Sequence, residues 1–358
     1  MPTTARAARR AFLPASVLIS ITIFFLAATK SLSMWIPYGL KPCLILAAIL
    51  TAATVTSCGK RDPVYPKKLS EWNIQNNPQA VAYQLQTPLF SDYADKERLV
   101  LLPANSKARF NEFAVYDFPV GTAIAKTFSY AGKRIETRVL YHDPQTKGWV
   151  GLPYVWSQDQ SEAMLELVPD PILLERNQQK FEYTIPNSNQ CKNCHENAGV
   201  MKPIGPKSRN LDAAATLRLT GVANQQPLDL ATLDNRARAY LDINCAHCHN
   251  PKGPANTSGL DLSYHQTEAA KIGVCKTPVA AGQGSGGLLF SIIPGRPEES
   301  ILMHRMKSTT PKVQMPELGR ALVHAEGVAL IREWIASQKG GCETASTSLD
   351  GHRDSLSE

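Results

Sequence analysis

Two five-residue stretches of this chain combine thiols and imidazoles at a spacing that supports chemistry, Cys191–His195 and Cys245–His249. Each stretch reads C-x-x-C-H, which is the attachment pattern of c-type haem. Two thiols on one turn of helix can form thioethers with the two vinyl groups of one haem, and the histidine that follows can bind the iron. We therefore predict two covalently bound haem c groups. The predicted attachment residues are Cys191, Cys194, Cys245 and Cys248, and the predicted iron ligands are His195 and His249.

A zinc module is the alternative interpretation of the four cysteines, since one C-x-x-C pair can combine with a second. That interpretation explains neither the histidine that follows each pair nor the export features at the N-terminus. The haem interpretation explains both, because covalent attachment of haem c takes place outside the cytoplasm in bacteria.

The first 57 residues have the features of an export signal. They contain basic residues, no acidic residue and two apolar runs, Leu13–Ala28 and Leu44–Val55. The second run ends in small residues before Cys58 and resembles a bacterial lipoprotein signal, in which Cys58 becomes the lipid-bearing N-terminus. Both runs are shorter than the roughly 20 residues of a membrane span, so cleavage is favoured over a transmembrane helix. Met34 begins a complete signal of its own. We expect an exported, lipid-anchored protein on the periplasmic face of a bacterial membrane.

The formal charge of +7 comes mostly from this N-terminal segment, which holds five of the 38 basic residues and none of the 31 acidic ones. The rest of the chain is close to neutral. Such a balance gives no support for a nucleic-acid partner or for a polybasic contact with a membrane.

The remaining cysteines also fit an oxidising compartment. Of eight cysteines, Cys43 would leave with the signal, Cys58 would carry lipid and four would hold haem, which leaves Cys275 and Cys342. We predict that these two form a disulfide. The alternative is a pair of free, buried thiols.

Residues 58–68 are polar and read as a tether, and residues 69–190 predict a β-rich domain. In Arg134–Tyr141, for example, Ile135 and Val139 share one face while Glu136 and Arg138 lie on the other. Short runs of this kind, separated by turn residues, favour an antiparallel sandwich or barrel. The other runs are Arg109–Phe118, Ile124–Tyr130, Trp149–Trp156 and Lys180–Ile185.

Residues 228–342 predict a mainly helical domain, after a connecting segment at 191–227 that carries the first motif and before a disordered tail at 343–358. Apolar residues at helical spacing lead into the second motif, and a second apolar stripe lies on His324–Gln338. These two segments resemble the crossed terminal helices of a class I cytochrome c. Met315 lies between them in a Pro-flanked loop, where that fold places its distal thioether ligand. Met303 and Met306 are the rivals, although their segment favours helical packing.

The distal ligand of the first haem cannot be assigned from spacing. The candidates are Met201, His265, His304 and His324, and a vacant sixth position is the remaining alternative.

Residues 85–338 resemble a family of bacterial di-haem c-type cytochrome lipoproteins. The resemblance implies haem content and export, and it names redox partner proteins, among them a secreted parallel β-helix protein, as candidate partners. The matching stretches are Thr87–Ala94, Phe118–Thr122, Ile135–Arg138, Arg236–His249, Pro278–Gly282 and Met315–Arg320.

The expected fold class is therefore α+β, with a β-rich domain followed by a cytochrome c-like domain. The expected function is electron transfer in the periplasm, because haem iron bound by His and Met changes oxidation state with little rearrangement. An enzyme, namely a di-haem peroxidase or oxidase-like protein with an open position on the first haem, is the main alternative. A lipoprotein whose haem is mainly structural ranks third.

Overall fold

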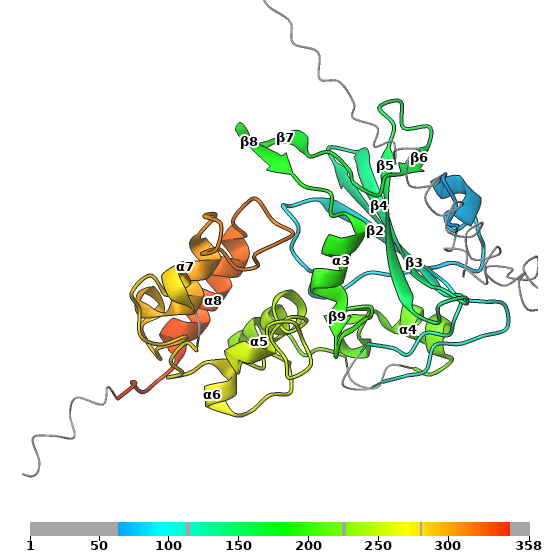
Figure 1. The fold of residues 1–358 in the computed structure, drawn as a ribbon. Coiled ribbons are helices and arrows are strands. Elements are labelled where there is room, and N and C mark those ends of the chain that lie inside the picture. Colours follow the sequence, from blue (N-terminus) through cyan, green and yellow to red (C-terminus); the bar gives the residue numbers. More distant parts are fainter. Residues whose placement is uncertain (1–63, 112–114, 224–226, 280, 344–358) are drawn as a thin grey trace, which may run out of the picture. The chain divides into compact units, whose positions relative to one another are not determined.

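The computed structural model describes residues 64–111, 115–223, 227–279 and 281–343 (Figure 1). The predicted signal, Cys58, most of the tether and the tail from residue 344 lie outside these ranges. The described residues all belong to one compact unit. In the described ranges, the helices are all too short or too polar to cross a lipid bilayer.

Six antiparallel strands form the main sheet, and each strand pairs with the next one along the chain. Three of the five predicted runs become β3, β4 and β5, to within one residue at each end. The described residues of the run predicted at Arg109–Phe118 form only isolated bridges, at Arg109, Val115 and Asp117. The strands are β1 (Val81–Ala82), β2 (Asp95–Leu101), β3 (Ala123–Tyr130), β4 (Lys133–His142), β5 (Trp149–Trp156) and β6 (Ala163–Leu165).

The predicted mixture of sheet and helices is present, but the sheet is open instead of a sandwich or a barrel. Its strand order begins at β1 and ends at β6, and those two edges are not paired with each other. Helices and a two-stranded hairpin bury the surface that a second large sheet would otherwise cover. These covering elements are β7 (Ile172–Arg176), β8 (Gln179–Tyr183), α3 (Ser188–His195) and α4 (Ala213–Thr220).

The two faces of the sheet have separate cores. One face packs Ala125 and Tyr154 against Leu69 in the short 3-10 helix η1 (Leu69–Trp72). The other face, which we call the motif face, carries Val100, Ile124, Leu140 and Gly151 in one row across β2 to β5. At one end of the motif face, Leu219 of α4 packs against this row.

Helix α4 lies in the segment that the sequence analysis treated as a connection. Asp212 caps its first turn by accepting from the backbone N–H of Ala215 at 2.7 Å, and Gly221 ends it in the left-handed conformation with φ 76°. Both caps are recognisable in the sequence as an Asp and a Gly that flank an Ala- and Leu-rich run.

Among the described residues of 228–342, the named elements are helices and none is a strand, although most of these residues lie in loops and turns. The two predicted helices, α5 and α8, pack their apolar faces into one core cluster with Met303 and Met306 of α7. Gly327 of α8 permits this approach, because a Cβ at that position would lie 2.3 Å from the Tyr240 hydroxyl of α5. The helices are α5 (Leu233–Asn244), α6 (Ala269–Ile272), α7 (Ile301–Lys307) and α8 (Ala325–Ser337).

Short elements complete the fold. Cys275, after α6, and Cys342, after α8, form a disulfide with a Cα–Cα distance of 5.2 Å, which is the pairing favoured over two free thiols. The short elements are β9 (Glu196–Asn197), β10 (Val200–Met201), η2 (Ser208–Asn210), η3 (Asn256–Ser258), η4 (Gly282–Ser285) and η5 (Pro297–Glu299).

Candidate functional site

The first C-x-x-C-H motif occupies the end of α3. The Asn187 side chain accepts from the backbone N–H of Gln190 at 2.8 Å, and the Gln190 side chain accepts from the N–H of Asn187 at 2.9 Å. This capping box starts the helix just before the motif. As a result, Cys191 and Cys194 lie three residues apart on one helical face and His195 is the last helical residue.

Helix α3 rests on the motif face of the sheet at Gly151. A Cβ placed on Gly151 would lie 2.9 Å from the Cβ of Cys191 and 3.0 Å from the terminal methyl of Met201. The Ser188 hydroxyl also donates to the carbonyl oxygen of Gly151 at 2.9 Å. The missing side chain therefore lets the first cysteine approach the strand directly.

His195 is held in one tautomer by the hairpin that follows it. Its Nδ1 lies 2.8 Å from the carbonyl oxygen of Lys202, and the backbone N–H of Lys202 donates to the carbonyl of His195 at 2.7 Å. A carbonyl oxygen only accepts, so Nδ1 carries the proton and Nε2 carries the lone pair. Burial lowers the pKa of His195 to about 4, which keeps the ring neutral near pH 7.

The second motif follows α5, and its histidine is fixed in the same way. The backbone N–H of His249 donates to the carbonyl of Cys245 at 3.0 Å, which continues the helical turn. His249 Nδ1 lies 3.0 Å from the Ser258 hydroxyl, which itself donates to the carbonyl of Ala255 at 2.7 Å. Because that hydroxyl proton is committed to Ala255, the hydroxyl accepts from Nδ1 of His249, and Nε2 is again the free lone pair. Burial, followed by the charge of Arg305, lowers the pKa of His249 to about 4.

The two motifs lie next to each other. The backbone N–H of Ala198 donates to the carbonyl of Lys252 at 2.7 Å, and each of these residues is the third after its motif histidine. Burial, followed by the charge of Cys194, raises the pKa of the Cys248 thiol to about 12. Thiols of separate motifs are thus close enough for their charges to interact.

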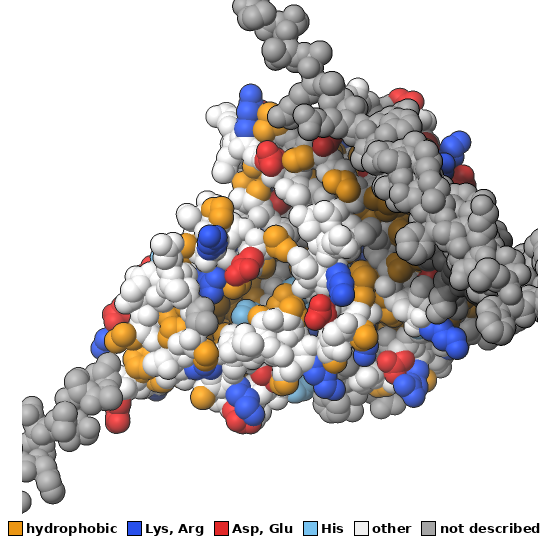
Figure 2. Space-filling view, viewed as in Figure 1, with side chains coloured by type: hydrophobic (Ala, Val, Ile, Leu, Met, Phe, Trp, Pro, Cys, Tyr) orange, Lys and Arg blue, Asp and Glu red, His pale blue; other side chains and the backbone are white. Residues whose placement is uncertain are grey.

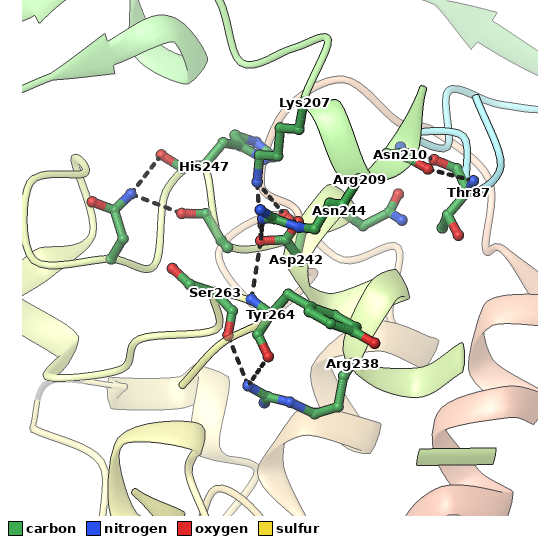
Figure 3. A network of polar contacts seen from close by, with 12 residues as sticks. Thr87, Lys207, Arg209, Asn210, Arg238, Asp242, Asn244, His247, Ser263 and Tyr264 are labelled. Atoms are coloured by element: carbon green, nitrogen blue, oxygen red, sulfur yellow. Dashed lines mark hydrogen bonds and ion pairs between the residues drawn. The ribbon is translucent and has the colours of Figure 1, made fainter. Parts of the chain in front are cut away.

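A buried ionic network joins the segments around both motifs (Figure 3). Asp242, in the last turn before the second motif, accepts from Lys207 Nζ at 3.0 Å and from Arg209 at 2.7 Å. The backbone N–H of Tyr264 also donates to Asp242, at 3.1 Å. Burial acts to raise the pKa of Asp242, but the charges of Lys207 and Arg209 hold it below its usual range.

His247, inside the second motif, is a polar residue that the sequence analysis did not single out. Its Nδ1 is buried and has no hydrogen-bond partner among the described residues, and Figure 3 shows the side chain close to Lys207. Burial, followed by the charge of His195, lowers the pKa of His247 to about 3. The two x positions of a C-x-x-C-H motif can hold any residue type, so the motif itself does not predict a role for His247. The sequence shows only that His247 is a further histidine within the second motif.

Met315 lies in a loop that polar contacts hold in place. Its backbone N–H donates to the carbonyl of Arg305 at 3.0 Å, and Arg320 donates to its carbonyl at 2.9 Å. Its side chain is half-buried, whereas Met303 and Met306 are 0% and 7% exposed within the core cluster. The two rivals therefore pack the core, and Met315 is the methionine of this region that stays outside that core.

The candidate ligands for the first haem have different surroundings. His324 stacks on Phe90 at 4.2 Å, with Nδ1 3.1 Å from the Tyr240 hydroxyl and Nε2 3.6 Å from a carboxylate oxygen of Glu326. Nδ1 is thus engaged in a hydrogen bond, whereas the Nε2 contact is longer than a hydrogen bond. Met201 lies against Gly151 beside Cys191. His265 packs edge-on against its neighbour Tyr264, and the His304 ring lies against Gly286.

The four motif cysteines are free thiols, in contrast to the disulfide-bonded pair. Over the described ranges, no three His, Cys, Asp or Glu side chains are grouped to hold a bare metal ion. A zinc module built from both C-x-x-C pairs would need such a group. Two separate thiol pairs, each followed by a neutral imidazole with a free Nε2, fit two haem groups.

Comparison with known proteins finds no matching family model, no similar curated protein and no similar solved structure. The function is therefore inferred from the residues of this chain.

Proposed function

We propose that this protein is an exported c-type cytochrome that carries two covalently bound haems and transfers electrons between partner proteins. The observation that carries the proposal is the matched state of the two motif histidines. In each motif Nδ1 donates to a fixed acceptor and Nε2 is left free beside a pair of unbonded thiols. A metal-binding histidine is usually oriented by such a bond from its other nitrogen.

Each motif would hold its group by three side chains. Cys191 and Cys194, or Cys245 and Cys248, would form the thioethers, and the following histidine would bind iron through Nε2. Bound haem iron supplies a one-electron couple whose potential depends on the axial ligands and on burial. The protein's part is to fix the imidazoles, through Lys202 in one site and Ser258 in the other, and to limit the access of water.

Transfer between the two sites is supported by the contact of Ala198 with Lys252, which ties the motifs together through a backbone hydrogen bond. Met315 is the proposed sixth ligand in the second site, and a thioether at that position raises the potential. On the face shown in Figure 2, basic and acidic side chains are interspersed, so this face does not present the single-sign field that would attract a polyanion. A secreted β-helix protein remains the candidate partner suggested by the family resemblance.

The sixth coordination position of the first haem iron decides between the two proposed functions, an electron carrier and a peroxidase-like enzyme. His247 has a buried Nδ1 that forms no hydrogen bond among the described residues, and the charge of His195 acts on its ring. If His247 binds the first iron, both haems have six ligands and the protein is a carrier. If that position is open, peroxide could reach the iron, and the peroxidase-like alternative applies.

Mass spectrometry of the exported, denatured protein tests the proposal. We expect a mass increase of two haems, which stays after extraction with acidified organic solvent. Replacing Cys191 and Cys194 with Ser should remove one haem, and replacing Cys245 and Cys248 should remove the other. A protein without covalent haem, when produced with functional haem-attachment machinery, would refute the proposal.

Replacing Cys58 with Ala should release the protein from the membrane fraction, and retention with both apolar runs uncleaved would favour a transmembrane segment.

A further inference from the structure

A row of cations crosses the motif face of the sheet. Arg98 of β2 pairs directly with Lys126 of β3, and Lys126 pairs directly with Arg138 of β4. Residues paired in this way lie on the same face with their Cβ atoms about 4.5–5.5 Å apart. Like charges at that separation repel, so an anion nearby would stabilise a row of three.

Among the described residues, a carboxylate forms an ion pair with this row of cations only at the Arg138 end. Glu136, which is completely buried, accepts from Arg138 Nε at 2.8 Å and from the Tyr183 hydroxyl at 2.5 Å. Arg98 is 6% exposed, and its buried Nε has no hydrogen-bond partner. Among the described residues, Lys126 Nζ makes no hydrogen bond and faces the ring of Phe128 at 5.7 Å. Burial, followed by the charges of Arg98 and Arg138, lowers the pKa of Lys126 to about 7. At the far end of the row, Arg98 Nη1 donates to the carbonyl oxygen of Lys96 at 3.2 Å, but Arg98 Nε and Lys126 Nζ have no hydrogen-bond partner among the described residues.

The row begins beside the first motif and runs away from it. The charge of Arg138 acts on Cys191, Cys194 and His195, and the charge of Lys126 acts on Cys194 and His195. Arg98 is one strand further, so the row extends about 10 Å across three strands. On the other side of Arg138, the paired residue in β5 is Pro153, which is followed along the same face by Gly151.

We infer that Arg98 and Lys126 bind the propionate carboxylates of the haem attached at Cys191 and Cys194. The propionates leave the porphyrin edge opposite the vinyl groups, so they point away from the thioethers, as the row does. Two carboxylates would supply the missing negative charge and an acceptor for the orphaned Nε of Arg98. This inference rests on the proposed function and adds the residues that orient the first haem.

The test uses the full exported protein with both haems. We would compare Arg98→Gln, Lys126→Gln and the charge-preserving Arg98→Lys. The matched control is Arg109→Gln, because Arg109 is an 81% exposed arginine of the same half of the chain and is paired with Asp117. Each variant is measured by haem content, by redox titration of both haems and by the propionate bending bands in resonance Raman spectra.

We expect both Gln variants to lower the midpoint potential of one haem, because a nearby cation stabilises the reduced and less positive iron. They should also shift the propionate bands of that haem, while Arg98→Lys and the control stay close to wild type. Two retained haems with unchanged potentials and propionate bands in Lys126→Gln and Arg98→Gln would overturn the inference and leave the two-haem proposal standing. A wild-type protein without covalent haem would overturn both.

Discussion

Gly151 gives the sharpest test of how the first motif is seated. In Gly151→Ala, the new Cβ would lie 2.9 Å from the Cβ of Cys191 and 3.2 Å from its sulfur, well inside ordinary contact distance. The methyl of Met201 can turn away, but Cys191 is fixed to α3, so the helix must shift. Overpacking of this kind costs about 1–3 kcal/mol, and removal of a strand glycine returns about 0.5–1 kcal/mol. The net expectation is a fall in the free energy of unfolding of up to about 2.5 kcal/mol.

The assay is denaturant unfolding combined with the haem content of each variant. Gly148→Ala is the matched control, because a Cβ there meets only the Thr146 hydroxyl, at an ordinary 3.6 Å. That control should change stability by no more than about 0.5 kcal/mol and keep both haems. Gly151→Ala should in addition reduce occupancy of the first site and leave the second site filled. Equal unfolding midpoints and equal haem contents for the two variants would refute the seating of α3 on Gly151.

Four further predictions concern single side chains. Ser258→Ala should raise the midpoint potential of one haem, because His249 loses the acceptor that increases its donor strength; redox titration checks this. Met315→Ala should lower the potential of one haem and remove its weak near-infrared band from a methionine ligand, as read by absorption spectroscopy. His247→Ala should convert one haem from low-spin to high-spin in the EPR spectrum and admit peroxide. Asp242→Asn should lower the free energy of unfolding by about 3–5 kcal/mol, because two buried cations lose their partner. Since the pKa of Asp242 is held below its usual range, its contribution should persist at neutral pH and be lost as the pH falls below about 4.

Controls separate these effects from general damage. Ser258→Thr keeps a hydroxyl and should keep the potential. Met303→Leu should cost stability without a spectral change, so a spectral change there with none in Met315→Ala would show that the ligand loop is wrongly assigned. A wild-type protein whose first haem is already high-spin would show that His247 is not its ligand. Asp117→Asn, in an ion pair that is 54% exposed on the acid side, should change stability by less than about 1 kcal/mol.

Local patterns predicted much of this structure. The strands β3, β4 and β5 follow from alternating apolar residues, and α5 and α8 follow from apolar stripes at helical spacing. In each case one face is apolar and is buried, so periodicity alone reveals it. The two haem motifs are visible for a different reason, because the chemistry of attachment requires a fixed spacing.

Hydrophobic alternation does not predict the burial of the charged residues in β2 and β4. In β4 the alternation predicted Glu136 and Arg138 on a face opposite the apolar one, but Glu136 is completely buried. Strand β2 was not predicted because four of its seven residues are charged, Asp95, Lys96, Glu97 and Arg98. A polar strand face is usually exposed to solvent. Only the folded structure shows that the face of β2 that carries Arg98 is buried. The same limit applies to His247, whose unpartnered nitrogen depends on packing between distant segments.

Polar contacts set the geometry between the two motifs. The helical core contains residues from 233 onward, whereas the two cores of the sheet contain residues from the first part of the described chain. A further apolar cluster contains residues of both parts, because Phe181 and Tyr183 pack there with Leu322. Close to the motifs, the joins are instead hydrogen bonds and ion pairs, namely Ala198 to Lys252 and Asp242 to its two cations. Such contacts are directional, so they fix position more tightly than an apolar surface that can slide. In the proposed cytochrome, the distance between the two haems would govern how fast an electron passes between them, and this junction of hydrogen bonds and ion pairs would hold that distance fixed.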